Sequence, residues 1–209
     1  MSIKSRLLPL VLVSAGLVSG CVSVLPDADP AAARYAIPAS DPADFPSLEP
    51  VSFSMTIEDP IATRAIDVTR IALIEKDATY TYYSEGEWAD RAPLLVHTAL
   101  IRSFQNSGSI ISVGGRTSQP IADYLLQLDI RSFEADLRTS EDKAHVAIFV
   151  RIANTRGKVF GAKLFEVRKV MSTDSPGGAA TALTDAFLEL SPQIVEWSLN
   201  IAAGAEDAA

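Results

Sequence analysis

The chain has 209 residues, a formal net charge of −8 at pH 7 and a single cysteine. Such an acidic chain is a poor candidate for binding nucleic acid or an anionic membrane surface, because both would repel it. A single cysteine also excludes a disulfide within the chain, so its stability must come from a hydrophobic core.

The first element is a basic and then apolar N-terminus. Lys4 and Arg6 precede an apolar run over residues 7–18, which is typical of a secretory signal peptide. The run is shorter than the roughly 20 apolar residues that a helix needs to cross a bilayer. It therefore does not predict a permanent membrane span.

The cysteine follows this run directly. The residues Val18-Ser19-Gly20-Cys21 resemble the lipobox of bacterial lipoproteins, in which a small residue precedes an invariant cysteine. The resemblance implies that residues 1–20 are a lipoprotein signal peptide and that Cys21 becomes lipidated, with acyl chains of the palmitate kind. Two or three acyl chains would hold the protein stably at a membrane. The alternative is a buried thiol, because free cysteine behaves as a small hydrophobe.

Residues 21–50 are predicted to form a lipidated, Pro/Ala-rich tether. Six of the 12 prolines fall here, at Pro26, Pro30, Pro38, Pro42, Pro46 and Pro50. Regular structure cannot persist through that spacing, apart from one short strand at residues 34–37. A single domain is predicted over residues 51–204, followed by a disordered tail at residues 205–209.

Short alternating segments predict strands in this domain, at residues 51–57, 70–77 and 79–83. Within residues 122–137, Leu126, Leu128 and Ile130 take one parity and polar residues the other. This strand should have one buried and one wet face, which a parallel strand covered on both faces would not show.

Two further strands are predicted at residues 145–153 and 158–167. They flank residues 154–157, Asn-Thr-Arg-Gly, which are typical of a hairpin turn. The sheet should therefore be largely antiparallel.

Two segments follow a helical period instead. The first comes after Asp90, with Pro93 in its first turn and Gly108 past its end. The second begins near Pro176, with Ser175 as its N-cap. Pro192 lies inside its apolar stripe, so this helix should kink or restart at Ser191.

Two helices on one face of a mostly antiparallel sheet give a two-layer α+β sandwich. Residues that carry catalytic or metal chemistry do not gather into a motif. His97 and His145 have no partner at metal-ligand spacing, so structural or exposed roles are predicted. Gly114-Gly115 lacks the GxGxxG and P-loop patterns. We therefore expect no metal, no cofactor and no enzyme activity.

Trp88 is unusual because it lies among Glu85, Glu87 and Asp90, just before the first helix. In one interpretation it is buried and fastens the helix to the sheet. In the other, Trp88 and Asp90 bind a partner, with the tryptophan as an anchor inside a polar rim. The sequence slightly favours burial, because a residue leading into a helix is easily covered.

Short motifs occur in order along the chain: Thr69-Arg70-Ile71, Tyr82-Tyr83, Trp88-Ala89-Asp90, Pro93-Leu94, Ser107-Gly108, and Tyr124 with Leu126 and Phe133. This order is similar to that of the ABC-type transport auxiliary lipoproteins of the PqiC type. The resemblance extends from the lipobox to the last helix. One departure is Val18, where leucine is commonest three places before the lipobox cysteine.

The resemblance implies a periplasmic lipoprotein that helps an ABC permease, its ATPase and an MCE-domain protein to move lipids across the cell envelope. Family members can assemble into rings, so a homo-oligomer is plausible. Val22, where an aspartate would favour inner-membrane retention in enterobacteria, implies the periplasmic face of the outer membrane of a Gram-negative bacterium.

Two other classes of function stay open. One is an envelope-assembly or scaffold lipoprotein that binds an outer-membrane protein. The other is a periplasmic enzyme, which would require a deep pocket lined by converging polar groups.

Overall fold

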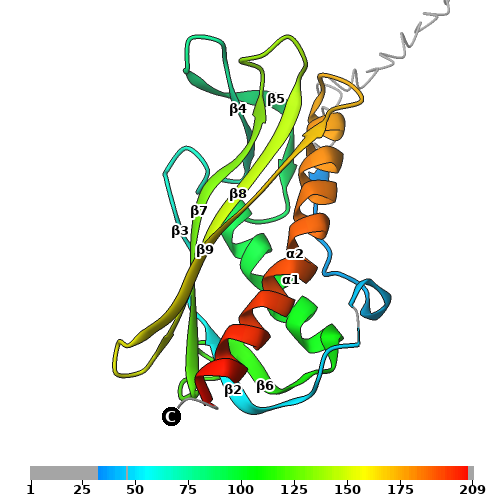
Figure 1. Cartoon of the computed structure of the whole chain (residues 1–209). Helices are drawn as coiled ribbons and strands as arrows, with labels where there is room; N and C mark the ends of the chain where they lie inside the picture. The colour runs from blue at the N-terminus through cyan, green and yellow to red at the C-terminus, as the bar shows by residue number, and fades with distance from the viewer. Residues whose placement is uncertain (1–32, 46, 207–209) are drawn as a thin grey trace, which may run out of the picture. The chain divides into compact units, whose positions relative to one another are not determined.

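A mixed β-sheet packed on two helices dominates the computed structural model, which describes residues 33–45 and 47–206 (Figure 1). The strands are β1 (Arg34–Tyr35), β2 (Val51–Ile57), β3 (Ile61–Ala62), β4 (Arg70–Ile74), β5 (Tyr80–Trp88), β6 (Ile110–Gly115), β7 (Tyr124–Asp136), β8 (Lys143–Asn154) and β9 (Val159–Val170). The helices are the 3₁₀ turn η1 (Pro42–Asp44), α1 (Ala92–Ser107) and α2 (Pro176–Glu206). Cys21 and the predicted signal peptide lie outside the described residues.

The predicted α+β class is confirmed, and the sheet is mixed. Its long ladders, β7 with β8 and β8 with β9, are antiparallel as predicted, and so is the pairing of β4 with β5. The shorter pairings of β1 with β5, β2 with β6, and β2, β3 and β4 with β7 are parallel. Parallel neighbours require crossover connections, and α1 lies in the connection that leads from β2 to its parallel neighbour β6.

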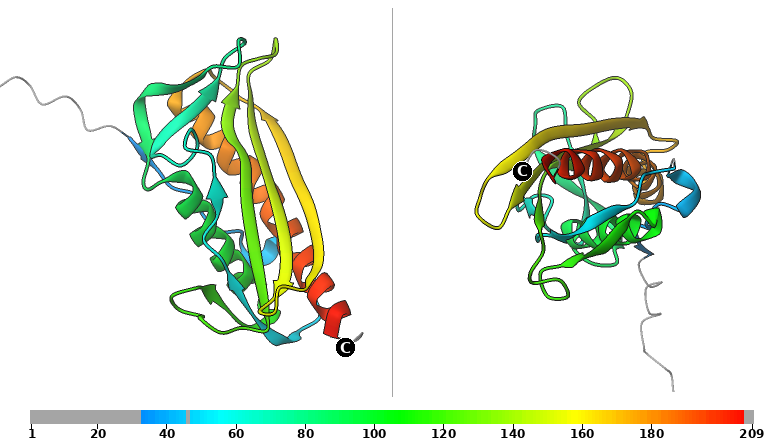
Figure 2. Two further views of the ribbon diagram at one scale, coloured as in Figure 1. Left: turned by 90° about the vertical axis from the view of Figure 1, so that its left-hand side faces the viewer. Right: turned by 60° about the horizontal axis from the view of Figure 1, so that its bottom comes forward.

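Both helices lie on the same side of the ribbon formed by β7, β8 and β9, with α2 between the ribbon and α1 (Figure 2). The inner face of β7 contributes Leu126, Leu128 and Ile130, each at most 2% exposed. A bulge after Ile130 shifts the alternation, so Phe133 continues the same buried face. Burying each such side chain contributes roughly 1.5–3 kcal/mol.

The helix ends follow the signals in the sequence. Gly108 closes α1 in the left-handed conformation at φ 66°, and its N–H donates to the carbonyl of Gln105. Ser175 caps α2, because its Oγ accepts the N–H of Gly178 at 3.1 Å. Among the described residues, no helix is long and apolar enough to cross a bilayer.

Of the two predicted outcomes at Ser191, a kink or a restart, the restart does not occur, because α2 runs unbroken through Pro192. The helix axis changes direction part-way along instead (Figure 1), which is the kink that an interior proline causes. Leu190 and Ile194, on either side of the proline, are both buried. Their packing holds the two halves of the helix on the same core.

Residues 33–45, which we call the strap, are packed on the domain instead of belonging to the predicted tether. Ser40 is fully buried, and its Oγ donates to Ser191 Oγ at 3.0 Å. Its N–H donates to Ser103 Oγ, and its carbonyl accepts the side-chain amide of Asn106 at 2.8 Å. The domain therefore begins well before residue 51, because side chains of α1 satisfy the backbone of Ser40 and a side chain of α2 accepts its hydroxyl.

Candidate functional site

Trp88, one of the two predicted partner-binding residues, is the last residue of β5 and is 1% exposed. Its ring lies 5.5 Å from that of Phe133 and 6.5 Å, edge-on, from that of Tyr35. The backbone N–H of Trp88 donates to the carbonyl of Thr69 at 2.7 Å. A binding anchor needs an accessible indole, so this geometry fits the interpretation in which Trp88 fastens elements of the core. Asp90 is exposed and stays a candidate for binding.

The strap joins the rest of the domain around Tyr35. A β-carbon at Gly86 would lie 2.9 Å from Cβ of Pro176 and 3.0 Å from the Tyr35 ring. Gly86 also has φ +78°, which glycine adopts without strain. The tyrosine ring therefore packs where only a glycine leaves room for it, directly beside the tryptophan.

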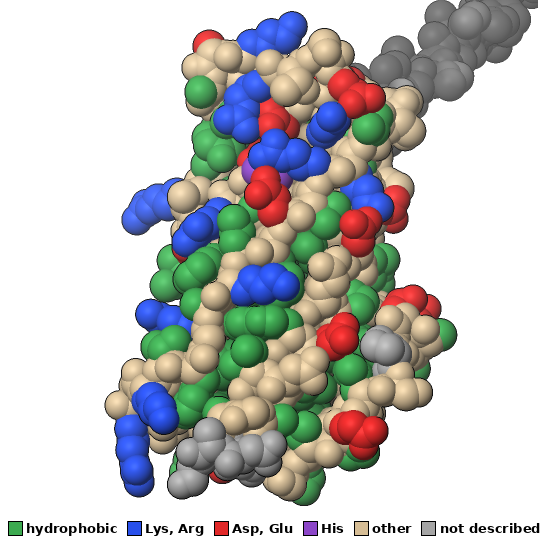
Figure 3. All heavy atoms as spheres, in the orientation of Figure 1, with side chains coloured by type: hydrophobic (Ala, Val, Ile, Leu, Met, Phe, Trp, Pro, Cys, Tyr) green, Lys and Arg blue, Asp and Glu red, His purple; other side chains and the backbone are tan. Residues whose placement is uncertain are grey.

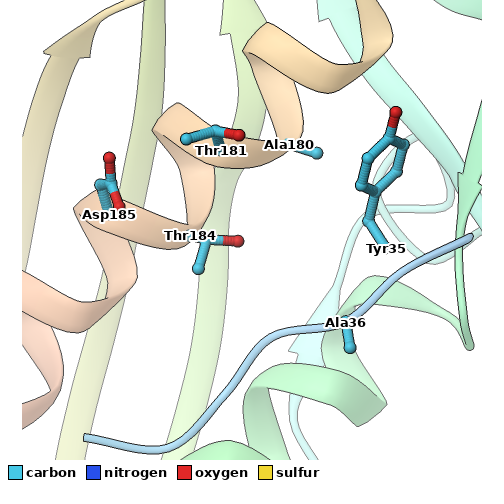
Figure 4. A pocket seen from close by; sticks show the side chains of 6 residues that line it. All are labelled: Tyr35, Ala36, Ala180, Thr181, Thr184 and Asp185. Carbon is cyan, nitrogen blue, oxygen red and sulfur yellow. The ribbon is translucent and has the colours of Figure 1, made fainter.

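A small groove opens beside this contact (Figure 4). Its volume is about 200 Å³, and it is lined by Tyr35 and Ala36 of the strap and by Ala180, Thr181, Thr184 and Asp185 of α2. Its lining is mixed, because the methyl groups of Ala36 and Ala180 lie among the polar groups of the threonines, Tyr35 and Asp185. Two of its lining residues, Tyr35 and Ala36, belong to the first segment that the structure describes.

The outer face of the β7–β9 ribbon, the face turned away from the helices, carries a second groove of about 290 Å³. Ile61, Phe149, Arg131 and Arg151 are among the residues that line it. Figure 3 shows basic side chains gathered along the ribbon side of the molecule and acidic ones more frequent toward α2. Charge is thus segregated within this acidic protein.

Near one end of the same face, His145 belongs to a polar cluster in which His145 and Glu134 are buried and Glu166 and Arg168 are exposed. His145 Nδ1 lies 3.4 Å from Glu134 Oε1, and Nε2 lies 2.9 Å from Glu166 Oε1 and 3.0 Å from Arg168 Nη2. Glu134 is 1% exposed and also accepts the N–H of Phe133. Hydrogen bonds from His145 and Arg168 lower the pKa of Glu166.

Sequence spacing missed this cluster because its members come from three strands. The predicted hairpin turn at residues 154–157 was a partial signal, since it brings the two strands together, but a bulge between Ile152 and Ala153 shifts the register that pairs His145 with Arg168. The partner Glu134 depends on the register with β7, which the turn does not define. Within the described part of the chain, no three His, Cys, Asp or Glu residues are placed to hold a metal ion.

Asp136 provides a test of how pH acts on this face. Arg138 donates to it from Nε and Nη2, both at 2.8 Å, and lowers its pKa to about 2 from the usual 3.8. A lowered carboxyl pKa stabilises the fold above pH 4, and this contribution is lost as pH falls through about 2. Asp136→Asn should therefore cost about 1–2 kcal/mol at pH 7 and progressively less toward pH 2.

Urea unfolding of both proteins at pH 7, 4 and 2.5 measures this difference. Asp185→Asn is the matched control, because Asp185 is exposed and has no ion-pair partner among the described residues. A gap between wild type and Asp136→Asn that stays constant with pH would contradict the proposed coupling to Arg138.

The family model for the ABC-type transport auxiliary lipoprotein component matches residues 35–195 of the chain. The chain belongs to this family. The match begins at Tyr35 of the strap, so it includes the contact with Trp88. It confirms the family that the sequence motifs indicated, and it makes the chain a lipoprotein component of ABC-type transport.

Solved structures show the same fold for this auxiliary lipoprotein. Protein XCC0632 from Xanthomonas campestris is 24% identical, with a TM-score of 0.73 over 84% of this chain and 98% of that chain. The crystal structure of another protein is 12% identical, with a TM-score of 0.61 over 78% of this chain and 96% of that chain. At these identities the likeness concerns the fold alone.

A curated relative extends beyond the auxiliary domain. The Bradyrhizobium diazoefficiens protein bll6063 is 29% identical over 155 residues, which are 74% of this chain and 41% of that protein. The chain thus spans about two fifths of the relative's length.

Proposed function

We propose that this auxiliary lipoprotein is anchored by lipid on Cys21 at the periplasmic face of the outer membrane of a Gram-negative bacterium. There it serves a lipid transport system built from an MCE-domain protein, an ABC permease and its ATPase. The family match over residues 35–195 is the observation that carries this proposal. The role is docking, with no catalysis, and further copies of the chain could take part.

The packed strap supports a docking role. It fastens the chain to both helices and to the Trp88 core before the chain continues toward the anchor. These contacts fix residues 33–45 on the domain, so the strap and the domain form one rigid unit. Such a domain can present a fixed surface to an envelope-spanning partner.

Affinity isolation of the lipidated, full-length protein from membranes tests the proposal. We expect the MCE-domain protein, the permease and the ATPase to co-purify, and membrane fractionation to place the complex with outer-membrane markers. The control joins residues 1–32 to an unrelated folded domain, because it keeps the anchor and loses the auxiliary domain. Recovery of an outer-membrane protein without transport components would favour the scaffold alternative. Recovery with inner-membrane markers would overturn the outer-membrane assignment.

A further inference from the structure

An apolar row crosses the outer face of the ribbon. Strand register places Ile61 of β3 beside Asp129 of β7, Asp129 beside Phe149 of β8, and Phe149 beside Leu164 of β9. Ile61 is 71% exposed and Leu164 is 40% exposed. Asp129 separates Ile61 from Phe149, whereas Phe149 and Leu164 are direct neighbours. Exposed apolar side chains gathered on a solvent-facing sheet are a typical mark of an interaction site.

Two arginines border this row with unused donors. The Arg131 guanidinium lies 4.4 Å above the Phe149 ring, and its Nε donates to Asp129. Arg151 donates through Nε to Gln127 at 2.7 Å. Among the described residues, the terminal nitrogens of both guanidinium groups have no hydrogen-bond partner. We call Ile61, Arg131, Phe149, Arg151 and Leu164 the outer-face patch.

The patch has a definite chemical preference. A guanidinium group binds a carboxylate through two parallel hydrogen bonds, and stacking on Phe149 holds Arg131 ready to do so. Aromatic and arginine side chains are the residues that dominate binding energy at protein interfaces. Two arginines outnumber the one carboxylate of Asp129 here, so the patch is locally basic within a chain whose net charge is −8 and attracts acidic groups.

We propose that the outer-face patch docks a segment of a partner protein in which carboxylates stand beside apolar side chains. Naming that partner as a component of the transport system rests on the proposed function. The carboxylates bind Arg131 and Arg151, and the apolar side chains cover Phe149 and the residues in its row. Docking is therefore stronger at low salt than at high salt, since exposed charges are screened.

Two other occupants fit the structure less well. An anionic membrane would be repelled by the net charge of −8 and by the Asp129 carboxylate, which lies within the row itself. A strand added along the outer edge of β9 meets Lys163 and Lys169, whose register partners are Val150 and Ala144 of the buried face. Inward-pointing charges on an edge strand oppose edge-to-edge pairing.

The test uses the lipidated full-length protein with a photo-crosslinking phenylalanine analogue in place of Leu164. The control carries the same analogue at Ile111, which is 72% exposed on β6. We expect a crosslinked partner peptide rich in Asp or Glu from the Leu164 position only. Arg131→Glu with Arg151→Glu should reduce its yield about 10-fold or more, because two charge-assisted contacts are lost.

Matched variants separate docking from folding. Arg102→Glu with Arg156→Glu changes the net charge equally at two exposed positions away from the patch and should leave the yield unchanged. Arg131→Gln with Arg151→Gln removes the charge without introducing repulsion and should also lower the yield. Thermal melting of each variant, at a midpoint close to that of the wild type, confirms that the fold is retained.

Each outcome decides one point. An unchanged yield in the glutamate variant, a peptide from a second copy of this chain, or patch-dependent binding to protein-free anionic vesicles would overturn the proposal. If the transport components co-purify equally with wild type and variant, the patch fails while the proposed function stands. If an acidic segment of a different protein is crosslinked and the glutamate variant loses it, the patch stands and the proposed function fails.

Discussion

Replacing Trp88 by alanine should destabilise the domain by about 3–5 kcal/mol, enough to unfold it or to prevent its accumulation. The indole is 1% exposed and contacts the rings of Tyr35 and Phe133, so its removal leaves a cavity among three strands. The strap loses its main aromatic contact at the same time. Urea unfolding and the level of soluble protein in the periplasm measure the effect.

Two controls make this result interpretable. Trp197→Ala removes the chain's other tryptophan, which is only partly buried against Phe165, and should cost less. Asp90→Asn changes an exposed residue beside Trp88 and should leave stability unchanged. A Trp88→Ala protein that melts like wild type and yet fails to co-purify with its partner would support the opposite view, in which the tryptophan is a binding anchor.

Local patterns predicted most elements because each carried a distinct physical signal. Residues 51–57 alternate and form β2 over the same bounds, and Gly108 closes α1 where the helical period stops. In β7 the buried residues Leu126 and Ile130 have even numbers, but the next large buried residue, Phe133, has an odd number. That mismatch was readable in the sequence as a bulge, since one extra residue turns the following side chains to the other face.

The packing of the strap could not be predicted from local sequence patterns. Prolines argue against helix and central strand, and residues 33–45 indeed form only the short β1 and η1. An extended proline-rich segment can still be ordered when distant side chains satisfy its backbone. The backbone of Ser40 bonds to Ser103 and Asn106 of α1, and its side-chain hydroxyl donates to Ser191 of α2. No local signal encodes partners that are 63 to 151 residues away.

The Trp88 region and the outer-face patch also differ in how far the sequence could predict them. The family motifs pointed to Trp88, and they marked a residue of the core, because fold-defining residues recur in a family as reliably as binding residues. Arg131, Phe149 and Arg151 carried no motif, since each is an ordinary residue of an alternating strand. Strand register brings them together, and the resulting face differs from the rest of the chain in both charge and apolar exposure.

Cys21→Ser should abolish membrane attachment, leaving a soluble protein or one that retains its uncleaved signal. The residues between Cys21 and the strap include Asp27 and Asp29, and the chain as a whole is acidic, so neither offers a lipid bilayer an alternative contact. Acyl chains contribute about 0.8 kcal/mol for each buried methylene group, so losing two or more of them removes essentially all of the affinity.

Fractionation of wild type and Cys21→Ser cells, together with labelling by a clickable fatty acid, measures this loss. Ser23→Ala is the control, because it alters a nearby residue outside the lipobox. Wild-type protein that incorporates no label would contradict the lipidation of Cys21.

The packed strap leads to a second expected effect of Cys21→Ser, because only residues 22–32 separate the anchor from the folded domain. Even fully extended, they reach at most roughly 40 Å. Loss of the lipid should therefore also abolish co-purification with membrane partners, because the lipid keeps the start of the folded domain within that distance of the bilayer.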